Sequence, residues 1–352
     1  MFHRISIICM MLGLLLATPT VAQTTLEPGD PVLRQLQSDP VAARATLEAR
    51  VLEGDAEAMN MLAILLSHDT RDWPAEPERS LALLEQAAAA GEPAARINLA
   101  TRLLLADDAS QYGRAIDLLR QVEGDARVEP LTRFAWGYAF LFGRGVERDL
   151  ARGSQSMQRA VEAHPTNMIA QFLLARSYQN GWGIEPDPVL AYRHMRIAAD
   201  AGDERAQWQV GMMLLNGSGV QVNEPEAYRF VRASGEAGYL RGMISTAVML
   251  ALGQGVEEND VEARDWYRRA AEQGSAHALR GLGGMLLSGE GGPADPERGV
   301  AYLLLAFEAG DALAGQTLDF VDIPDDPALQ ARLAAHRSQW VAQFGRPTTD
   351  ED

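Results

Sequence analysis

The apolar residues between positions 203 and 237 recur with the period of an α-helix. In residues 203–216 and again in residues 224–237, apolar or small side chains fall on one helix face. The two sets are Ala206, Val210, Met213 and Leu214, and Ala227, Tyr228, Val231 and Ala237. Neither segment alternates with the period of two that is typical of a strand. The pattern therefore predicts two helices, here called A and B, separated by a short turn.

Glycines interrupt these helices at an interval of 36 residues. One series follows each B helix, and a second series forms Gly-x-Gly turns between A and B. The first series is Gly202, Gly238, Gly274 and Gly310; the second starts at Gly181, Gly217, Gly253 and Gly289, with a further turn at Gly143, 38 residues before Gly181. Helices commonly end at positive φ, which glycine adopts without a steric penalty. The two series predict a repeat protein built from helix-turn-helix units.

One repeat carries a complete motif: Ala247-x-x-Leu250-x-x-Gly253-x-Gly255-Val256, followed by Ala263-x-x-Trp266-Tyr267-x-x-Ala270-Ala271-Glu272-x-Gly274. This motif resembles the Sel-one-like repeat (SLR), a relative of the tetratricopeptide repeat, and the resemblance covers residues 129–310. Upstream of residue 129 the Gly-x-Gly-Val turn is missing, so plain tetratricopeptide-like units describe residues 54–124 equally well. The resemblance implies an all-α fold, a right-handed α-solenoid of stacked helix-turn-helix repeats with about seven units plus caps.

The expected organisation follows from these boundaries. It is a signal peptide at 1–22, N-terminal capping helices at 23–53, two degenerate repeats at 54–127, five SLR repeats at 128–310, C-terminal capping helices at 311–345 and an acidic tail at 346–352. We expect the N-terminal cap to be interrupted near Asp39-Pro40, and residues 327–344 to form a polar-faced helix that closes the stack. Such caps keep an apolar edge out of water. The tail is expected to be disordered from Thr348 onward.

The N-terminus predicts export. His3 and Arg4 precede an apolar run at residues 5–17, and the small residues of Thr20-Val21-Ala22 offer a cleavage site before Gln23. The run is shorter than the roughly 20 apolar residues of a spanning helix. We therefore expect a periplasmic or secreted chain that is not inserted in the membrane after cleavage. Its single cysteine, Cys9, lies within the expected signal, so the mature chain would have no thiol.

Composition narrows the class of partner. The net charge of −17 argues against nucleic acid or an anionic membrane, because both require a basic footprint. Every Lys or Arg position is arginine, a bias typical of GC-rich genomes. Together with the signal peptide, this bias indicates the periplasm of a Gram-negative bacterium.

The polar residues do not form a catalytic or metal-binding pattern. The histidines of the mature chain are His68, His164, His194, His277 and His336, which fall in different repeats at different positions. No His-x-x-x-His pair occurs, and the mature chain would have no cysteine ligand, so we expect no metal site and no cofactor. Carboxylates occur throughout the chain, so no acid–base pair stands out. We expect a protein that is not an enzyme.

Two columns of residues on the A helices would face a partner if tetratricopeptide geometry applies. The expected partner-binding residues are Phe134, Phe172, Arg205, Trp208, Arg241 and His277. Aromatic side chains can anchor a peptide, and arginines can bind carboxylates bidentately. The alternative interpretation is that the aromatic column forms the core between repeats and the arginines make surface ion pairs.

Two functions follow from the resemblance and the residues. The resemblance implies a scaffold or adaptor that binds a protein or peptide partner, in envelope signalling, exopolysaccharide regulation or complex assembly. The alternative is a binder or modifier of cell-wall or exopolysaccharide, for which Trp182 or Trp266 beside carboxylates would form the sugar platform.

Overall fold

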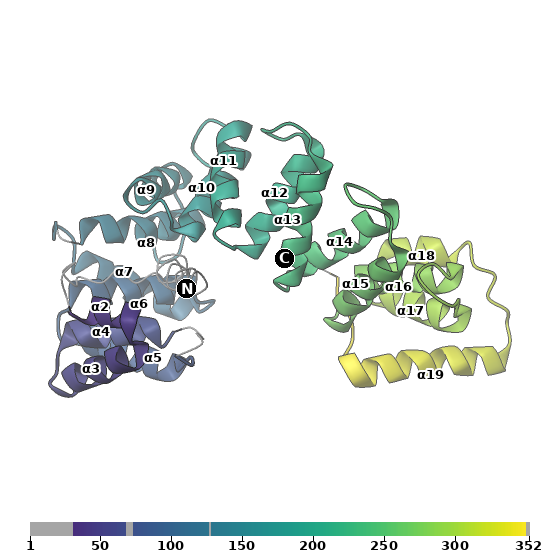
Figure 1. The fold of residues 1–352 in the computed structure, drawn as a ribbon, viewed down its shortest axis with the longest axis horizontal. Helices are drawn as coiled ribbons and strands as arrows, with labels where there is room; N and C mark the ends of the chain where they lie inside the picture. The colour runs from purple at the N-terminus through teal and green to yellow at the C-terminus, as the bar shows by residue number, and fades with distance from the viewer. Residues whose placement is uncertain (1–30, 68–72, 127, 350–352) are drawn as a thin grey trace. The chain divides into compact units, whose positions relative to one another are not determined.

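The computed structural model describes residues 31–67, 73–126 and 128–349, and within these ranges the chain forms α-helices joined by turns (Figure 1). The described ranges contain no strand, only one isolated β-bridge. The all-α prediction is confirmed. The expected signal peptide at 1–22 lies outside the described residues, as do residues 23–30 of the expected N-terminal cap.

Two helices precede the repeats, α2 (Pro31–Ser38) and α3 (Pro40–Leu52). The predicted interruption at Asp39-Pro40 is confirmed. The Asp39 carboxylate accepts a hydrogen bond from the backbone N–H of Ala42 at 3.0 Å, and Pro40 is the first residue of α3. Both features favour the start of a new helix.

The next helices of the described chain form seven antiparallel A–B pairs. The pairs are α4 (Ala56–Leu65) with α5 (Pro77–Ala89), α6 (Pro93–Leu105) with α7 (Tyr112–Arg120), α8 (Glu129–Phe142) with α9 (Leu150–Ala163), α10 (Met168–Asn180) with α11 (Pro188–Asp200), α12 (Glu204–Asn216) with α13 (Glu224–Glu236), α14 (Leu240–Leu252) with α15 (Asp260–Glu272), and α16 (Ala276–Ser288) with α17 (Pro296–Glu308). A short 3-10 helix, η1 (Ala109–Gln111), precedes α7.

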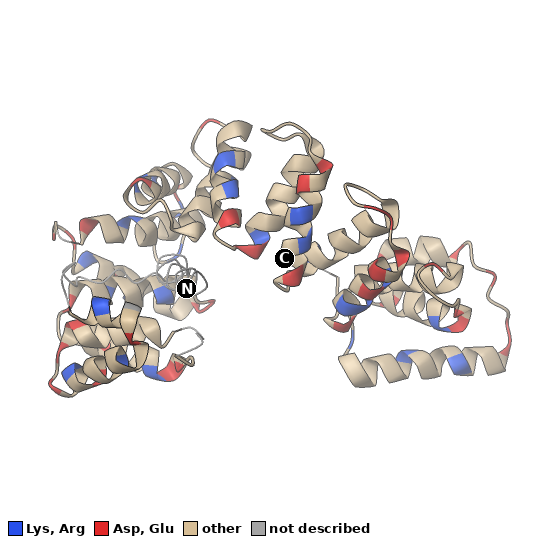
Figure 2. Ribbon diagram, in the orientation of Figure 1, with Lys and Arg blue, Asp and Glu red and all other residues tan. Residues whose placement is uncertain are grey.

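Packing divides the chain into two compact units, unit 1 at residues 1–201 and unit 2 at residues 202–352. The described part of unit 1 holds α2–α11, and unit 2 holds α12 to the C-terminal helices. Charged residues lie along the helices of both units (Figure 2). Many arginines pair with a carboxylate one helix turn away or on a neighbouring helix, as Arg133 does with Glu129 at 2.7 Å.

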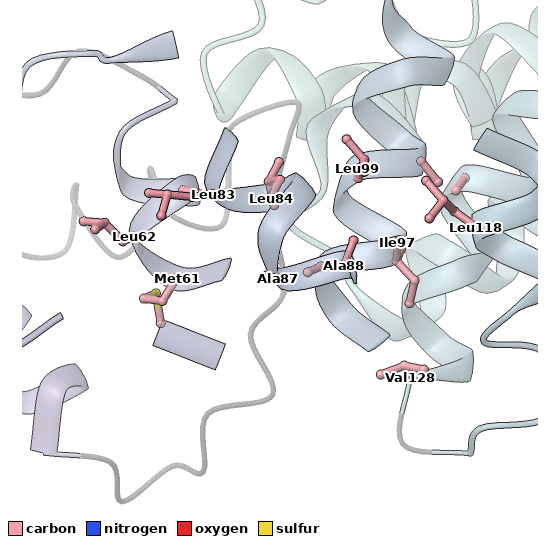
Figure 3. Packing of buried hydrophobic residues seen from close by; sticks show 14 of the residues in the cluster. Met61, Leu62, Leu83, Leu84, Ala87, Ala88, Ile97, Leu99, Leu118 and Val128 are labelled. Atoms are coloured by element: carbon pink, nitrogen blue, oxygen red, sulfur yellow. The ribbon is translucent and has the colours of Figure 1, made fainter. Parts of the chain in front are cut away.

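The core of unit 1 consists of aliphatic side chains from successive helices. Met61 and Leu62 of α4, Leu84 of α5 and Leu99 of α6 are almost fully buried (Figure 3). Small residues such as Ala87 allow the helix backbones to approach closely. Burying one such leucine stabilises the fold by about 1.5–3 kcal/mol, so this continuous core holds the repeats together.

The Gly-x-Gly turns have the predicted backbone conformation, and the second glycine has a further role. Gly253 ends α14 with φ +62°, and its N–H bonds the carbonyl of Met249. Gly255 has φ +70°, and a Cβ placed there would lie 2.2 Å from the carbonyl oxygen of Glu224 on α13. The turn therefore packs directly against the backbone of the preceding B helix, which only glycine permits.

Unit 2 is closed by α18 (Ala312–Leu318) and α19 (Pro327–Phe344). The predicted closing helix at 327–344 is confirmed, and it packs against α17. The ring of Trp340 is buried and meets Tyr302 of α17 edge-on, with 4.7 Å between ring centroids. Leu333 is also buried, against Val300 and Ala301. The cap thus covers apolar surface that α17 would otherwise expose.

The residues after α19 differ from the expectation. Thr348 forms a β-bridge with Ser275: its N–H donates to the Gly274 carbonyl at 2.8 Å, and its carbonyl accepts from the Ala276 N–H at 3.0 Å. Pro347 is buried. The expected disorder from Thr348 is therefore wrong for Thr348 itself, because its backbone groups find partners at the start of α16. The acidic residues 350–352 lie outside the described chain.

Candidate protein-binding surface

The start of α12 determines which of its side chains face outward. The Asp203 carboxylate caps the helix by accepting the Ala206 N–H at 2.9 Å. Ala206 and Val210 are fully buried in unit 2. Trp208 lies on a different side of the helix and is only half-buried. The predicted binding residue Trp208 is therefore accessible, unlike an ordinary core tryptophan.

Three residues, two from α14 and one from its N-cap, hold the Trp208 ring in place. Its Nε1–H donates to the Ser245 hydroxyl at 3.0 Å. Tyr239 meets the ring edge-on at 6.0 Å, and the Arg241 guanidinium carbon lies 5.4 Å from the ring centroid. An aromatic side chain with its polar atom satisfied loses little conformational entropy when a partner binds. The structure thus brings together two of the predicted residues, Trp208 and Arg241.

The outward face of α14 continues this surface with apolar side chains. Arg241, Ser245, Val248 and Leu252 follow the i, i+4, i+7, i+11 spacing of one helix stripe. Val248 is 37% exposed and Leu252 is 70% exposed. We call the set Trp208, Arg241, Val248 and Leu252 the α12–α14 surface. It combines an aromatic ring, a cation and exposed aliphatic groups, as protein-binding hot spots do.

Arg205 lies one helix turn before Trp208 and is held by its own cap residue. One of its guanidinium nitrogens is 2.9 Å from the Asp203 carboxylate, which is almost fully buried. Burial opposes the charged form of Arg205, but the hydrogen bond that Arg205 donates to Asp203, together with the negative charges of Asp203 and Glu204, outweighs burial and raises the pKa of Arg205 above its usual value. Arg205 is therefore a charged residue with an oriented side chain at the edge of the surface.

His277 belongs to a different cluster, at the start of α16. Its Nε2 is 3.9 Å from a carboxylate oxygen of Asp311, and Arg280 Nε lies 3.0 Å from the same oxygen. Asp311 is buried and also caps α18 through the N–H groups of Leu313 and Ala314. Sequence reasoning missed the pairing of Arg280 with Asp311. The available signal was aspartate at the same repeat position in Gly202-Asp203 and Gly310-Asp311.

The two phenylalanines predicted to bind a partner lie in unit 1. Phe134 is 8% exposed and belongs to the core around Leu141 and Met157. Its expected role is therefore corrected to that of a packing residue. Phe172 is half-buried and packs against the same core. For Phe134 the alternative interpretation is therefore correct, because this member of the aromatic column belongs to the core between repeats.

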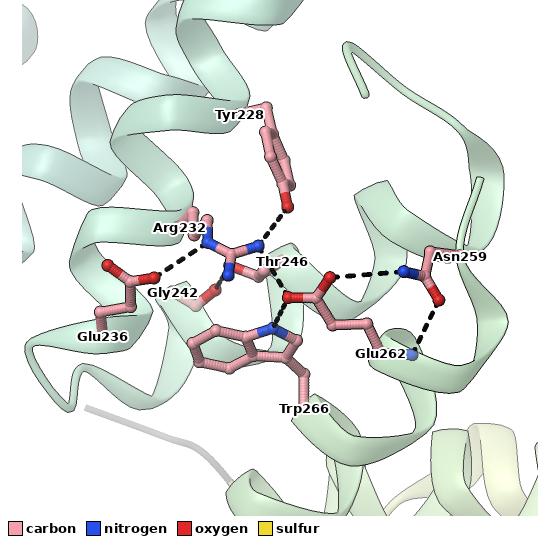
Figure 4. Close-up of polar contacts among 8 residues, drawn as sticks. All are labelled: Tyr228, Arg232, Glu236, Gly242, Thr246, Asn259, Glu262 and Trp266. Atoms are coloured by element: carbon pink, nitrogen blue, oxygen red, sulfur yellow. Dashed lines mark hydrogen bonds and ion pairs between the residues drawn. The ribbon is translucent and has the colours of Figure 1, made fainter. Parts of the chain in front are cut away.

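The tryptophans of the polysaccharide alternative differ in exposure. Trp266 is 2% exposed, and its Nε1–H points at Glu262 at 3.4 Å (Figure 4). This burial rules Trp266 out as a sugar platform. Trp182 is half-buried, with the Arg176 guanidinium carbon 5.9 Å from its ring centroid.

No group of three or more His, Cys, Asp or Glu side chains in the described ranges is arranged to hold a metal ion. None of the described helices is both long and apolar enough to cross a membrane.

Comparison with known proteins identifies the repeat. The Sel1 repeat family model matches six segments that together make up more than half of the chain: 56–92, 131–153, 169–203, 204–239, 241–275 and 276–311. The first of the two upstream units is thus matched as a Sel1 repeat. All of α6 and α7 fall in the unmatched interval between residues 92 and 131.

Among solved structures, the chain is similar to a Sel1 repeat protein from Oxalobacter formigenes, with 26% identity, a TM-score of 0.56, and coverage of 66% of this chain and 95% of that chain. A protective antigen of uropathogenic Escherichia coli with an SLR fold matches at 17% identity and a TM-score of 0.27, over 96% of this chain and 94% of that chain. No curated protein gives a significant match.

Proposed function

Because the chain belongs to the Sel1 repeat family, we propose that it is a non-enzymatic scaffold that binds a protein or peptide partner through its A helices. The proposed location is the periplasm, or outside the cell after secretion. The proposed processes are envelope signalling, exopolysaccharide regulation or assembly of an envelope complex. Repeat scaffolds of this architecture present extended binding surfaces because each helix-turn-helix repeat contributes one helix to the same face.

The observation that carries the proposal is the α12–α14 surface. Trp208 is ordered by Ser245 and Arg241 yet remains half-buried, and Leu252 on the adjoining helix is 70% exposed. Apolar groups that remain in water after folding can be buried by a partner, which gains about 25 cal/mol per Å² of apolar area. Arg241 adds a cation that can bind a carboxylate or carbonyl of the partner.

The test is a pull-down of the tagged chain from an envelope extract of its own organism. The Trp208→Ala, Arg241→Glu variant is compared with wild type, with equal helicity checked by circular dichroism. A matched control is Phe307→Ala, Arg229→Glu, which changes an exposed aromatic residue and an exposed arginine on B helices. Truncating a hot-spot tryptophan costs about 2–4 kcal/mol of binding free energy.

The expected result is one protein that wild type and the control recover and that the Trp208 variant loses, with the difference reproduced by the purified partner. Equal recovery by all three would contradict a role for the α12–α14 surface. Binding of wild type to isolated peptidoglycan or exopolysaccharide, without any recovered protein, would favour the polysaccharide alternative, for which Trp182 supplies the accessible ring.

Export is tested separately. The expected N-terminus of the mature chain is Gln23, and the protein should be recovered in the periplasmic fraction or the medium. N-terminal sequencing of the protein from its own organism decides this point. A mature chain that retains residues 1–22 in the cytoplasmic fraction would contradict export.

A further inference from the structure

Unit 1 contains a groove that is lined by none of the predicted partner-binding residues. The B helix α7 is 9 residues long, whereas the other B helices of the described chain have 13 or 14. Beyond the end of α7, at Arg120, a groove of about 1030 Å³ opens between the following turn and α9. Its floor is α8. The last residue of the short helix α7, Arg120, forms part of the groove's lining.

The floor of the groove is aromatic. Trp136 and Phe140, one helix turn apart on α8, stack with 5.7 Å between ring centroids. Phe140 is buried, whereas Trp136 is half-buried and lines the groove. The guanidinium carbon of Arg152 lies 4.0 Å from the Phe140 ring centroid. The floor therefore offers an apolar platform with a cation at one side.

The α9 wall carries arginines that are not neutralised by a carboxylate. Arg152 and Arg159 are exposed, and within the described residues neither side chain pairs with an acidic group. By contrast, Arg133 on the floor pairs with Glu129, and Arg120 on the far wall pairs with Asp117. Arg152 and Arg159 lie two helix turns apart on the same side of α9 and both line the groove. They provide positive charge that a partner can complement.

From these features we propose that the α7–α9 groove is a second binding site, for an acidic segment of a protein partner in polyproline II conformation. Arg152 and Arg159 would each bind a carboxylate, and an apolar side chain between them would cover Trp136. The site lies in unit 1 and uses neither helix of the α12–α14 surface. It is therefore independent of the function proposed above.

Helix geometry specifies the spacing of the two carboxylates. Arg152 and Arg159 are seven residues apart on α9, a rise of about 10 Å at 1.5 Å per residue. A polyproline II peptide has three residues per turn and a rise of about 3.1 Å per residue, so residues i and i+3 lie on the same side, about 9 Å apart. The recognised pattern is therefore an acidic residue, two intervening residues of which one is apolar, and a second acidic residue.

The charge balance of the groove favours a peptide over a long polyanion. Its lining contains five arginines and four carboxylates, a net excess of only one positive charge, so binding depends on local contacts with Arg152 and Arg159. A polymer with many anionic groups would extend beyond the groove and meet the repulsion of a chain with net charge −17. The aromatic floor also gives an apolar side chain of a peptide somewhere to bind.

The experiment measures fluorescence anisotropy of a labelled, N-acetylated and C-amidated peptide, Gly-Ser-Asp-Phe-Ser-Asp-Gly-Ser, titrated with the purified chain. The comparison peptide replaces both aspartates by asparagine. The groove variant carries both Arg152→Glu and Arg159→Glu. The matched control carries both Arg193→Glu and Arg229→Glu, which reverse the charge of two exposed residues on other B helices. Because Arg159 makes no side-chain hydrogen bond or ion pair in the described chain, Arg159→Glu alone serves if the double variant unfolds.

The expected result is saturable binding of the aspartate peptide by wild type and control. Loss of a charged contact weakens binding about tenfold, so the asparagine peptide and the groove variant should each bind at least about tenfold more weakly. Trp208→Ala, Arg241→Glu should bind the peptide like wild type, which separates this site from the first.

Three results would overturn the proposal. They are no saturable binding of the aspartate peptide, equal binding of the two peptides, and equal binding by the groove variant and the control. Binding of an oligogalacturonate through Arg152 and Arg159, without binding of the peptide, would assign the groove to an anionic polysaccharide instead.

Discussion

The guanidinium of Arg232 on α13 donates a hydrogen bond to the carboxylate of Glu262 on α15, with 2.7 Å between Nη1 and Oε1 (Figure 4). The same arginine donates to the Tyr228 hydroxyl at 2.7 Å and to Glu236 at 2.9 Å. These contacts, the Tyr228 hydrogen bond first, raise the pKa of Arg232 above its usual value. Glu262 also faces the indole nitrogen of Trp266. One arginine thus joins two consecutive B helices over a buried tryptophan.

Replacement of Glu262 by alanine is expected to lower the free energy of unfolding by about 1–2 kcal/mol, because it removes a charged acceptor from partly exposed partners. Glu257→Ala is the matched control, since Glu257 is an exposed glutamate in the turn that precedes α15. Urea unfolding provides the measurement. In a double-mutant cycle with Arg232→Ala we expect a coupling of about 0.5–1 kcal/mol; additive effects would show that the two side chains contribute independently.

Two glycines with positive φ should respond very differently to alanine. A Cβ at Gly255 would lie 2.2 Å from the Glu224 carbonyl oxygen, whereas a Cβ at Gly238 meets nothing within 4 Å. Gly238→Ala should therefore cost only the left-handed backbone strain, about 1–2 kcal/mol. Gly255→Ala adds a backbone clash and should cost about 3 kcal/mol or more. Similar midpoints in urea for the two variants would contradict the close approach of this turn to α13.

The C-terminal cap should depend on the volume of Trp340 and not on its indole nitrogen. Trp340→Ala removes the ring that packs on Tyr302 and Phe344 and should cost about 3–5 kcal/mol. Within the described residues Nε1 of Trp340 has no hydrogen-bond partner. Trp340→Phe should therefore retain most of the stability. Limited proteolysis in the loop before α19 checks this, and equally fast cleavage of the two variants would contradict it.

His194 should make stability depend on pH near neutrality. Burial, with a contribution from the charge of Arg193, lowers the pKa of His194 below its ordinary value of 6.5. Its Nδ1 lies 2.7 Å from Gln171 Oε1, and its ring stacks on Tyr178 with 5.7 Å between centroids. The neutral ring is thus favoured in the folded state.

The direction in which stability changes with pH follows from proton binding. Below the ordinary pKa the unfolded chain binds more protons than the folded chain, so the stabilisation is complete above that pH and is lost as the pH falls through the folded pKa. Between about pH 7.5 and about pH 5.5, the unfolding midpoint of wild type should therefore fall more than that of His194→Gln. His164 is shifted in the same direction and is retained in both proteins. Parallel pH profiles would contradict the assignment to His194.

Features that depend on a short stretch of chain were predictable. The helix at residues 327–344 and the break at Asp39-Pro40 were both predicted. In the structure each of these helices begins with a proline that follows a capping aspartate, a signal contained in two adjacent residues. The sequence predicted the glycines of each Gly-x-Gly turn from the positive φ that the turn requires. The contact of the second glycine with the preceding B helix was not predicted, because that contact joins residues about 30 positions apart.

The candidate sites were less predictable. The groove in unit 1 lies beside the short helix α7. A repeat pattern does not reveal how far a degenerate helix continues. The pairing of Arg280 with Asp311 likewise joins residues 31 positions apart. Pairings between residues this far apart in the sequence form only when the helices pack, so local periodicity does not predict them.

Phe134 and Trp208 occupy the same column of the repeat, yet Phe134 is a core residue and Trp208 is half-buried. The sequence by itself determined the helices, the turns and the repeat interval of 36 residues, because these depend on apolar periodicity and on the backbone freedom of glycine. The tertiary structure decided which members of a column are exposed and which arginines are paired. The physical reason is that exposure and pairing depend on the neighbouring helices, whose side chains differ from one repeat to the next.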